Sequence, residues 1–253
     1  MSIFGSLFKS KSGDADYPAV TDYSSVVTDI HSHLIPGIDD GVKTIDESLA
    51  MLRNFYSLGF RKIVTTPHVM SDYFKNNPDT ILGGLETVRN AIQTNGMDIT
   101  IDAAAEYYLD EYFIRKLGKE RMLTIGDNYL LFEISYINPP DNINSAIFEM
   151  NVNGYQPLLA HPERYDYWYQ KIDSYRKIKD AGVLFQLNIN SLTGYYGIAA
   201  RRTAEKLIDE NMIDFIGSDL HGERHLKGLR RAIDEKYMHK LLAQGIRNPS
   251  LFS

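Results

Sequence analysis

Short apolar runs alternate with amphipathic stretches along most of this sequence, and that alternation restricts the fold more than any other feature. The runs are rich in β-branched residues, as is typical of buried strands. We predict strands at 26–30, 62–66, 99–105, 129–132, 157–160, 183–188 and 215–217. We predict amphipathic helices between them, at 46–58, 80–94, 143–153, 167–180, 199–210 and 226–242. Thr44 and Glu47 have the spacing of a capping box at the start of the first helix.

Seven strands alternating with helices predict a parallel sheet, because parallel strands need crossover connections. The sequence lacks the Gly-rich fingerprint of a dinucleotide-binding fold, so we predict an α/β fold whose sheet closes into a barrel. A length of 253 residues suits one large domain, and no linker-like segment divides the chain. We expect a flexible segment at 1–25 and a single barrel domain at 26–253.

Composition excludes several functional classes. A net charge of −6 without a basic run argues against nucleic acid as a partner. The chain has no cysteine, which rules out disulfides, zinc fingers and a cysteine nucleophile. No apolar stretch is long enough to cross a bilayer, and the first residues lack the apolar region and cleavage site of a secretory signal. We therefore expect no transmembrane segment and a cytoplasmic location.

Side chains of the kind that bind metals recur at one position relative to the predicted strands. Five of the seven histidines, and several carboxylates, stand at or just after the C-terminal end of a strand. Active sites of parallel barrels are built at that rim, and six of the seven strands deliver a candidate ligand to it. The candidate metal ligands are His31, His33, Asp40, His68, Glu106, Glu133, His161, Asp219 and His221.

Each of these residues has a simpler explanation when it is considered alone. A pair such as His31 and His33 often arises by chance, and Asp39-Asp40-Gly41 is typical of a turn. The other candidates are explained as solvated strand ends, helix caps or core histidines. The conjunction favours a metal site, because all of these explanations would have to coincide at one rim. His225 and His239 lack this placement, and a surface role is the better interpretation for them.

The ligand types indicate a catalytic site rather than a structural one. Imidazole and carboxylate without thiolate suit manganese, iron or zinc. Nine ligands exceed what one ion uses, so we expect two or three divalent ions, two of them joined by a shared glutamate.

Seven sequence features, taken together and in order, resemble a known family. They are D-I-H-S-H at 29–33, G-I-D-D-G at 37–41, T-P-H at 66–68, Glu106, L-F-E at 131–133, H-P-E-R at 161–164 and S-D-x-H at 218–221. They resemble the polymerase and histidinol phosphatase (PHP) family, and within it the bacterial capsule-type protein-tyrosine phosphatases, which use metals instead of cysteine. Two features favour that subgroup: the Asp-Asp-Gly after H-x-H, and F-Q-L-N at 185–188 followed by S-L-x-G-x-x-G at 191–197.

The resemblance implies a distorted seven-stranded (β/α) barrel of the PHP type with three metal ions, typically manganese. Carried over residue by residue, it assigns His31, His33, Glu106 and Asp219 to the first ion, Glu106, Glu133 and His161 to the second, and Asp40, His68 and His221 to the third.

The resemblance also implies two catalytic arginines. Arg164 follows the H-P-E motif, and Arg224 stands past the final D-x-H in a loop that departs from the family's spacing. The alternative for Arg164 is a surface ion pair with Glu163 or Asp166.

The implied activity is hydrolysis of phosphotyrosine by a metal-activated hydroxide, with a bacterial tyrosine kinase of the capsule or exopolysaccharide pathway as the protein substrate. A small-molecule phosphatase, for example one for histidinol phosphate, and a non-catalytic metal-binding scaffold stay open as alternatives. Homo-oligomer formation is open too, because charges on the first helix can mediate self-association. Aromatic residues of the rim loops either stack on a phosphotyrosine ring or cap the barrel. They are Tyr73, Phe74, Tyr107, Tyr108, Tyr165, Tyr167, Trp168, Tyr195 and Tyr196.

Overall fold

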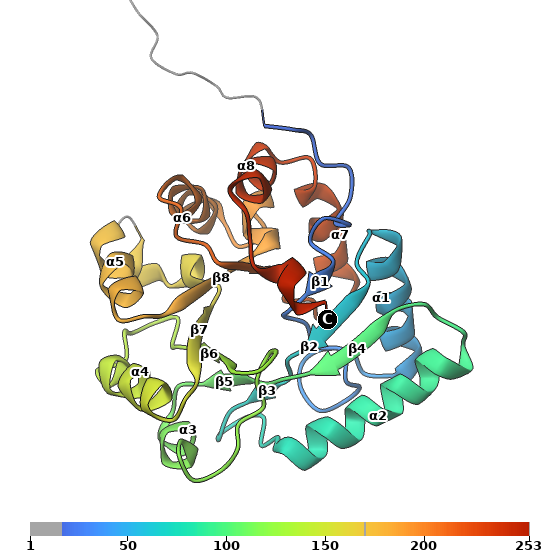
Figure 1. The fold of residues 1–253 in the computed structure, drawn as a ribbon, viewed down its shortest axis with the longest axis horizontal. Helices are drawn as coiled ribbons and strands as arrows, with labels where there is room; N and C mark the ends of the chain where they lie inside the picture. Colours follow the sequence, from blue (N-terminus) through green and yellow to red (C-terminus); the bar gives the residue numbers. More distant parts are fainter. Residues whose placement is uncertain (1–16, 170, 253) are drawn as a thin grey trace, which may run out of the picture.

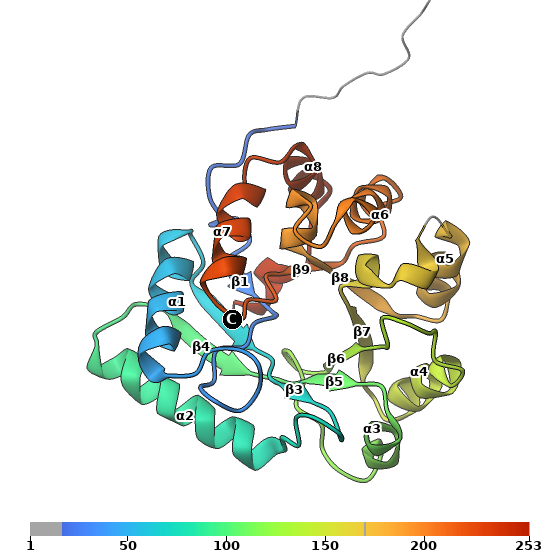
Figure 2. The same ribbon diagram turned by 180° about the vertical axis from the view of Figure 1, so that it is seen from behind.

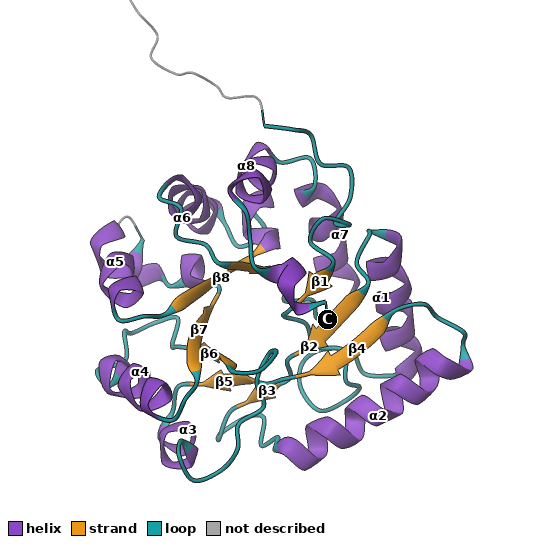
Figure 3. Cartoon of the chain, in the orientation of Figure 1, coloured by secondary structure: helices purple, strands orange, loops and turns teal. Residues whose placement is uncertain are grey.

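The computed structural model describes residues 17–169 and 171–252. Its short strands form a ring that the helices surround on the outside (Figure 1, Figure 3). The strands of the described residues are β1 Thr28–Asp29, β2 Lys62–Thr65, β3 His68–Val69, β4 Thr100–Ala103, β5 Glu106–Tyr108, β6 Tyr129–Glu133, β7 Gln156–Ala160, β8 Leu184–Asn188 and β9 Phe215–Gly217. Their α-helices are α1 Ile45–Ser57, α2 Pro78–Thr94, α3 Glu111–Lys116, α4 Ile143–Val152, α5 Ile172–Asp180, α6 Ile198–Asp209, α7 Glu223–Ala232 and α8 Lys236–Gln244. The predicted α/β class is confirmed.

The strands of the described residues form two parallel sheets. One has the order β1-β2-β4 and the other the order β3-β5-β6-β7-β8-β9. The chain passes directly from β2 into β3 and from β4 into β5, so the two sheets are continuous along these two segments. The sheets also meet beyond β1 and β9, where the amide of Asp219 donates to the His31 carbonyl at 2.7 Å and the amide of His33 donates to the Leu220 carbonyl at 2.9 Å. The sheet therefore curls until its last strand lies against its first.

Two of the predicted strands are each divided into two. The predicted strand 62–66 ends at Thr65, and the chain resumes as β3 after Pro67, which has no amide hydrogen to give to a sheet. The predicted strand 99–105 divides in the same way, because β4 pairs with β2 whereas β5 pairs with β3. The prediction of seven strands thus differs from the nine that the described residues form.

The helices agree with their predicted positions except in three places. The short helix α3 was not predicted. The predicted helix 226–242 is two helices, α7 and α8, because Glu235 has an extended backbone and its carboxylate pairs with Arg201 of α6 at 2.9 Å. The predicted helix 167–180 begins only at Ile172. Thr44 caps α1, its hydroxyl accepting the Glu47 amide at 3.2 Å. The predicted capping box is not completed, because the Glu47 carboxylate accepts the amide of Lys43 instead of that of Thr44.

Two groups of buried side chains fill the two layers of the fold. The inner group includes Ile30, Leu131, Leu158 and Phe215, which come from strands or strand ends. The larger outer group packs the strands against the surrounding helices. A 3₁₀ turn, η4 (Asn248–Leu251), lies against the start of β1 near the C-terminus (Figure 1).

The segment before β1 is packed from Tyr23 onward. The Tyr23 ring is buried and stacks on Phe60 at 4.8 Å between centroids, and its hydroxyl donates to the Leu229 carbonyl at 2.8 Å. The packed part of the domain therefore reaches back before residue 26. The first 16 residues of the segment expected to be flexible lie outside the described residues. Among the described helices, none is long and apolar enough to cross a membrane.

Replacing Asn248 with alanine is expected to lower the free energy of unfolding by about 2–4 kcal/mol, because three buried backbone groups lose their partner. The Asn248 side chain accepts the Ile216 amide at 3.0 Å and donates to the carbonyls of Thr28 and Ile216 at 2.9 and 2.8 Å. Urea unfolding measures the change. Asn151→Ala, at an exposed position of α4, is the matched control and should change stability by less than about 0.5 kcal/mol.

Candidate metal centre

The ends of the parallel strands bring all nine predicted ligands to one rim. His31 and His33 follow β1, and His68 opens β3. Glu106 and Glu133 lie in β5 and β6, His161 follows β7, and Asp219 and His221 follow β9. Asp40 comes from the loop between β1 and α1. Figure 2 shows the ring of strands from the side opposite to Figure 1.

One group of four buried side chains converges on a common point. Donor atoms of His31, His33, Glu106 and Asp219 all lie within 4.8 Å of one another. His31 Nε2 lies 3.1 Å from Glu106 Oε2 and 3.4 Å from Asp219 Oδ1. His33 Nε2 lies 3.6 Å and 3.4 Å from the same two oxygens. Two imidazoles and two carboxylates therefore face one small volume.

Two further groups adjoin the first. Donor atoms of His68, Glu106 and Glu133 lie within 4.8 Å of one another, and so do those of His33, Asp40, His68 and His221.

His161 joins the second group through its ring, because its Nε2 lies 3.0 Å from Glu106 Oε1 and 3.9 Å from Glu133 Oε2. His68 faces both groups, with Nδ1 3.1 Å from Glu106 Oε2 and Nε2 3.5 Å from Asp40 Oδ1.

The chemistry of the group fits divalent cations. His31 Nε2, His33 Nε2 and Glu106 Oε2 are buried and make no hydrogen bond within the described residues. Buried polar atoms without a partner are rare in folded proteins, and here three of them point at one another. Nitrogen and oxygen donors without thiolate are the set that manganese, iron and zinc accept in catalytic sites.

The two ring nitrogens of several histidines have different roles. His31 Nδ1–H donates to Gln186 Oε1 at 2.8 Å, and His33 Nδ1–H donates to Asp39 Oδ2 at 2.8 Å. His221 Nδ1–H donates to the Asp219 carbonyl at 3.0 Å. In each ring this directs Nε2 toward the cluster, where a divalent ion would displace its proton and bind the nitrogen.

The charges of the cluster are strongly coupled. Burial opposes protonation of His31, but the carboxylates of Glu106 and Asp219 outweigh it and raise its pKa to about 9. Burial likewise opposes the charge of Glu106, but His31 and His68 hold its pKa well below the usual range. Burial and the nearby Arg164 lower the pKa of His161. The carboxylate of Glu106 is therefore ionised and can bind a cation.

Two ligand positions have a left-handed backbone. His161 has φ of 33° and Asp219 has φ of 49°. Few residues other than glycine adopt this region, and strain of this kind concentrates at functional sites. Both residues end a strand, where the turn directs the side chain toward the cluster.

Several residues of the site were not predicted. Asp39, which the sequence indicated as a turn residue, accepts the His33 ring and also the His68 amide at 3.2 Å. Gln186 and Asn188 come from β8, the one predicted strand without a ligand, and Asn188 Nδ2 donates to Asp219 Oδ2 at 3.0 Å. The only signal for them was the F-Q-L-N motif itself.

Arg164 lies beside the cluster, and its side chain is only 20% exposed. It does not form the alternative surface pair with Glu163 or Asp166; its Nη1 donates to Asp219 Oδ2 at 2.8 Å. Its guanidinium carbon lies 4.0 Å from the ring centroid of Tyr196 and 4.9 Å from that of Tyr136.

Arg224, the second predicted arginine, is exposed in the first turn of α7. It makes no side-chain hydrogen bond or ion pair with any ligand among residues 17–169 and 171–252.

The two histidines for which a surface role was predicted are both half-buried. His225 is half-buried, and its Nδ1 accepts the amide of His221 at 3.0 Å, so it supports the loop that carries a ligand. Burial lowers its pKa to about 4, which keeps the ring neutral. His239 contacts the Ile233 carbonyl at 2.8 Å, within the α7–α8 corner. The interpretation as a surface residue is therefore wrong for His225.

Some aromatic residues of the rim are buried and others are exposed. Tyr107, Tyr165 and Trp168 are buried and cap the fold. Phe74 stacks on the His68 ring at 5.3 Å between centroids. Tyr73 is exposed, and Tyr195 is partly exposed.

Most of the chain matches the model of a known protein family. The family model described as "Capsular polysaccharide synthesis, CpsB/CapC" matches residues 27–249. The chain belongs to the CpsB/CapC family. This confirms the predicted resemblance to the capsule-type enzymes, and the match spans every candidate ligand.

Three named tyrosine-protein phosphatases are similar to most of the chain. The putative tyrosine-protein phosphatase CapC of Staphylococcus aureus is 29% identical, covering 77% of this chain and 77% of its own. The tyrosine-protein phosphatase YwqE of Bacillus subtilis is 26% identical, covering 76% of both chains. The tyrosine-protein phosphatase CpsB of Streptococcus pneumoniae is 29% identical, covering 76% of this chain and 82% of its own.

A solved structure shares the fold. It comes from crystallographic work on YwqE from Bacillus subtilis and CpsB from Streptococcus pneumoniae, described as unique metal-dependent tyrosine phosphatases. The superposition has a TM-score of 0.74 at 24% identity and covers 81% of this chain and 85% of that chain.

Proposed function

We propose that this protein is a metal-dependent protein-tyrosine phosphatase that hydrolyses phosphotyrosine without a covalent enzyme intermediate. One observation carries the proposal: nine candidate metal ligands converge at one rim beside a half-buried arginine that packs against two tyrosine rings. The proposal is supported by membership of the CpsB/CapC family and by relatives that are named tyrosine-protein phosphatases. The absence of cysteine leaves no thiol for the alternative phosphatase mechanism.

The proposal extends to the fold type and the metals. The hydrogen bonds that join the ends of β1 and β9 support a distorted seven-stranded barrel of the PHP type, with β2–β3 and β4–β5 each counted as one bent strand. We infer a single phosphatase domain over residues 26–253, to which the packed residues from Tyr23 onward also belong. Two or three ions, manganese by preference over iron or zinc, would be held by the sets assigned above, with Glu106 shared between the first two.

Bound there, divalent ions would polarise the phosphoryl group and lower the pKa of the attacking water. Side chains of the protein would bind the phosphoryl oxygens and orient the metal ligands. Arg164 has guanidinium donors beyond the one on Asp219, and these can pair with phosphoryl oxygens, whose charge persists in the transition state. The rings of Tyr136 and Tyr196 both pack against that guanidinium. Asn188 and Arg164 together orient Asp219 through its Oδ2.

The proposed partner is a phosphotyrosine protein, specifically a tyrosine kinase of the capsule or exopolysaccharide pathway, and the proposed location is the cytoplasm. This part is supported by the family description and the names of the relatives. Whether the protein assembles as a homo-oligomer is a separate question that solution scattering would answer.

Treatment with a chelator is expected to lower turnover of a phosphotyrosyl peptide by at least about 100-fold. Manganese should restore activity better than magnesium, because magnesium prefers oxygen ligands and water over imidazole. The measurement is steady-state hydrolysis with elemental analysis of the same samples. Histidinol phosphate serves as the second substrate, and faster turnover of it would favour a small-molecule phosphatase. Undiminished turnover by protein shown to be metal-free would refute the metal mechanism.

A further inference from the structure

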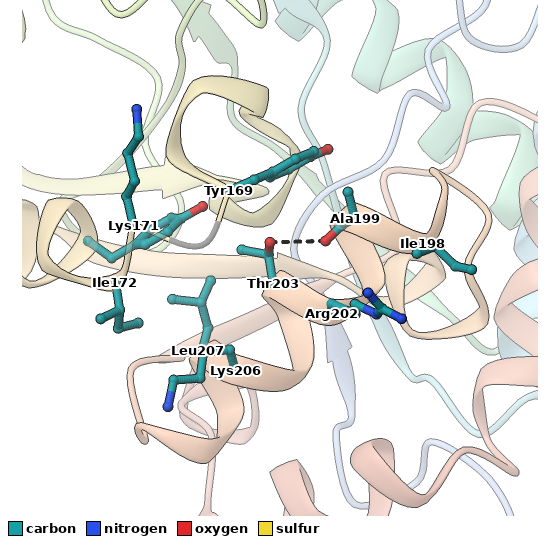
Figure 4. Close-up of a pocket in the computed structure, with 10 residues that line it drawn as sticks. Tyr169, Lys171, Ile172, Ile198, Ala199, Arg202, Thr203, Lys206 and Leu207 are labelled. Atoms are coloured by element: carbon teal, nitrogen blue, oxygen red, sulfur yellow. Dashed lines mark hydrogen bonds between the residues drawn. The ribbon is translucent and has the colours of Figure 1, made fainter.

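A cavity separate from the metal cluster lies between α5 and α6. Its volume is about 370 Å³. Ile172 and Leu207 provide apolar walls, and Tyr169 closes one side (Figure 4). Lys171, Arg202 and Lys206 also line it, and all three are exposed. A cavity with apolar walls and several cations is suited to a ligand that has both an apolar part and negative charge.

The cations of this cavity are poorly neutralised. Among residues 17–169 and 171–252, the side chains of Lys171 and Arg202 have no carboxylate within ion-pair distance, and Lys206 pairs with Glu210 at 2.8 Å. Other arginines on the same two helices are paired: Arg176 with Glu210 and Arg201 with Glu235.

The positive charges of Lys171 and Arg202, which have no ion-pair partner within the described part of the chain, therefore lie together at the cavity, although the chain as a whole has a net charge of −6. Such a local positive patch attracts and orients an acidic partner.

The walls of the cavity continue into the segments that hold Arg164. Tyr169 follows Arg164 by five residues, and the Tyr175 hydroxyl donates to the Pro162 carbonyl at 3.2 Å. On the other wall, α6 begins at Ile198, two residues after the Tyr196 ring that packs on the guanidinium.

At that end of α6, the Ile198 side chain is 68% exposed and Tyr195 is 36% exposed. An extended chain with its phosphate at the metal cluster can therefore reach this cavity along an exposed apolar edge.

We propose that this cavity is a subsite for an acidic segment of the polypeptide substrate, one that carries an apolar side chain next to a carboxylate. This inference rests on the proposed function, because it places the phosphotyrosine of the same polypeptide at the metal cluster. Arg202 and Lys206 lie four and eight residues after the start of α6, which is about 6 and 12 Å along a helix axis. An extended peptide covers about 3.3 Å per residue, so these two cations lie about two to four peptide residues beyond the start of α6. Positions about three to five residues from the phosphotyrosine allow in addition for the path from the metal cluster to that helix.

The test compares matched substrates and variants. The substrates are two phosphotyrosyl peptides that differ only in having glutamates or lysines three to five positions from the phosphotyrosine on both sides, and a small aryl phosphate. Arg202→Glu reverses a charge of the cavity, and Ala199→Phe fills it without changing charge. Lys119→Glu, at an exposed position after α3 with no side-chain partner among the described residues, is the control for charge reversal.

Arg202→Glu is expected to lower kcat/KM for the acidic peptide by about tenfold, through KM rather than kcat. Ala199→Phe should lower it in the same way. Neither variant should change turnover of the small aryl phosphate, and Lys119→Glu should change neither reaction. Equal efficiency of wild-type protein on the two peptides, or an equal loss on the peptide and the aryl phosphate, overturns the inference.

A binding measurement separates this inference from the proposed function. A fluorescein-labelled acidic peptide without phosphate should bind wild-type protein, and its anisotropy change should fall in Arg202→Glu and Ala199→Phe. If wild-type protein hydrolyses no phosphotyrosyl peptide but this binding pattern holds, the proposed function fails and the subsite stands. If hydrolysis is normal but neither variant alters binding or KM, the subsite fails and the proposed function stands.

Discussion

Glu106→Gln is expected to lower kcat/KM for a phosphotyrosyl peptide by about 10³-fold and to lower the metal content of the purified protein. The substitution keeps the size of the side chain but removes its negative charge and replaces one acceptor oxygen by a donor. The measurements are steady-state kinetics and elemental analysis on the same preparation, with circular dichroism to establish folding.

The expected effect is large because Glu106 faces more of the cluster than any other carboxylate. Its Oε2 lies 3.1 Å from both His31 Nε2 and His68 Nδ1, and its Oε1 lies 3.0 Å from His161 Nε2. It belongs to two of the three ligand groups, so one substitution weakens two candidate metal positions. Loss of a charge shared by two cations costs more than loss of a terminal ligand.

Glu163→Gln is the matched control for this prediction. Glu163 is also a buried glutamate, but its Oε1 accepts the Ser191 hydroxyl at 2.6 Å and the Asn188 amide at 3.1 Å instead of facing the cluster. Burial raises its pKa to about 7, so a neutral amide resembles a form that it already adopts. This variant should keep its metal. If Glu106→Gln also keeps full metal and turnover, Glu106 does not belong to the site.

The placement of the ligands was predictable because it depends only on strand ends. A histidine or carboxylate after a buried apolar run, such as His68 or His161, reaches the same rim whichever neighbours its strand pairs with. Errors of a few residues in strand limits did not matter for this argument. The division of the strand at Pro67, and of the helix at Glu235, did not move any ligand away from the rim.

The supporting residues could not be predicted for a physical reason. Gln186 and Asn188 act through hydrogen bonds to side chains that are distant in sequence, and such partners follow from the three-dimensional register of the strands. Asp39 is only six residues from His33, but its contact depends on the path of the loop between β1 and α1. Their residue types are common in turns and strand ends. His225 was misjudged on the same grounds, because its contact is a backbone amide that no pattern reveals. The cavity between α5 and α6 likewise depends on how two helices pack.

Arg164→Ala is expected to lower kcat/KM by about 100-fold or more, as for removal of one preorganised electrostatic donor. The guanidinium cannot be a ligand, because it stays protonated and offers no lone pair. Arg164 could also act only by orienting a metal ligand, since its Nη1 donates to Asp219 Oδ2 at 2.8 Å. The experiment must therefore separate a phosphate-binding arginine from one that only orients a ligand.

Asn188→Ala makes that separation, because Asn188 Nδ2 is the other donor to Asp219 Oδ2, at 3.0 Å. If Arg164 binds the phosphoryl group, Arg164→Ala loses far more activity than Asn188→Ala at similar metal content, and inhibition by inorganic phosphate weakens only in the arginine variant. Arg164→Lys should recover part of the activity, since a point charge cannot make the two-pronged contact. If the two alanine variants lose similar activity and metal, and both are inhibited by phosphate as wild-type protein is, Arg164 serves Asp219 alone. Phosphate would then be bound by the metals and by groups other than Arg164.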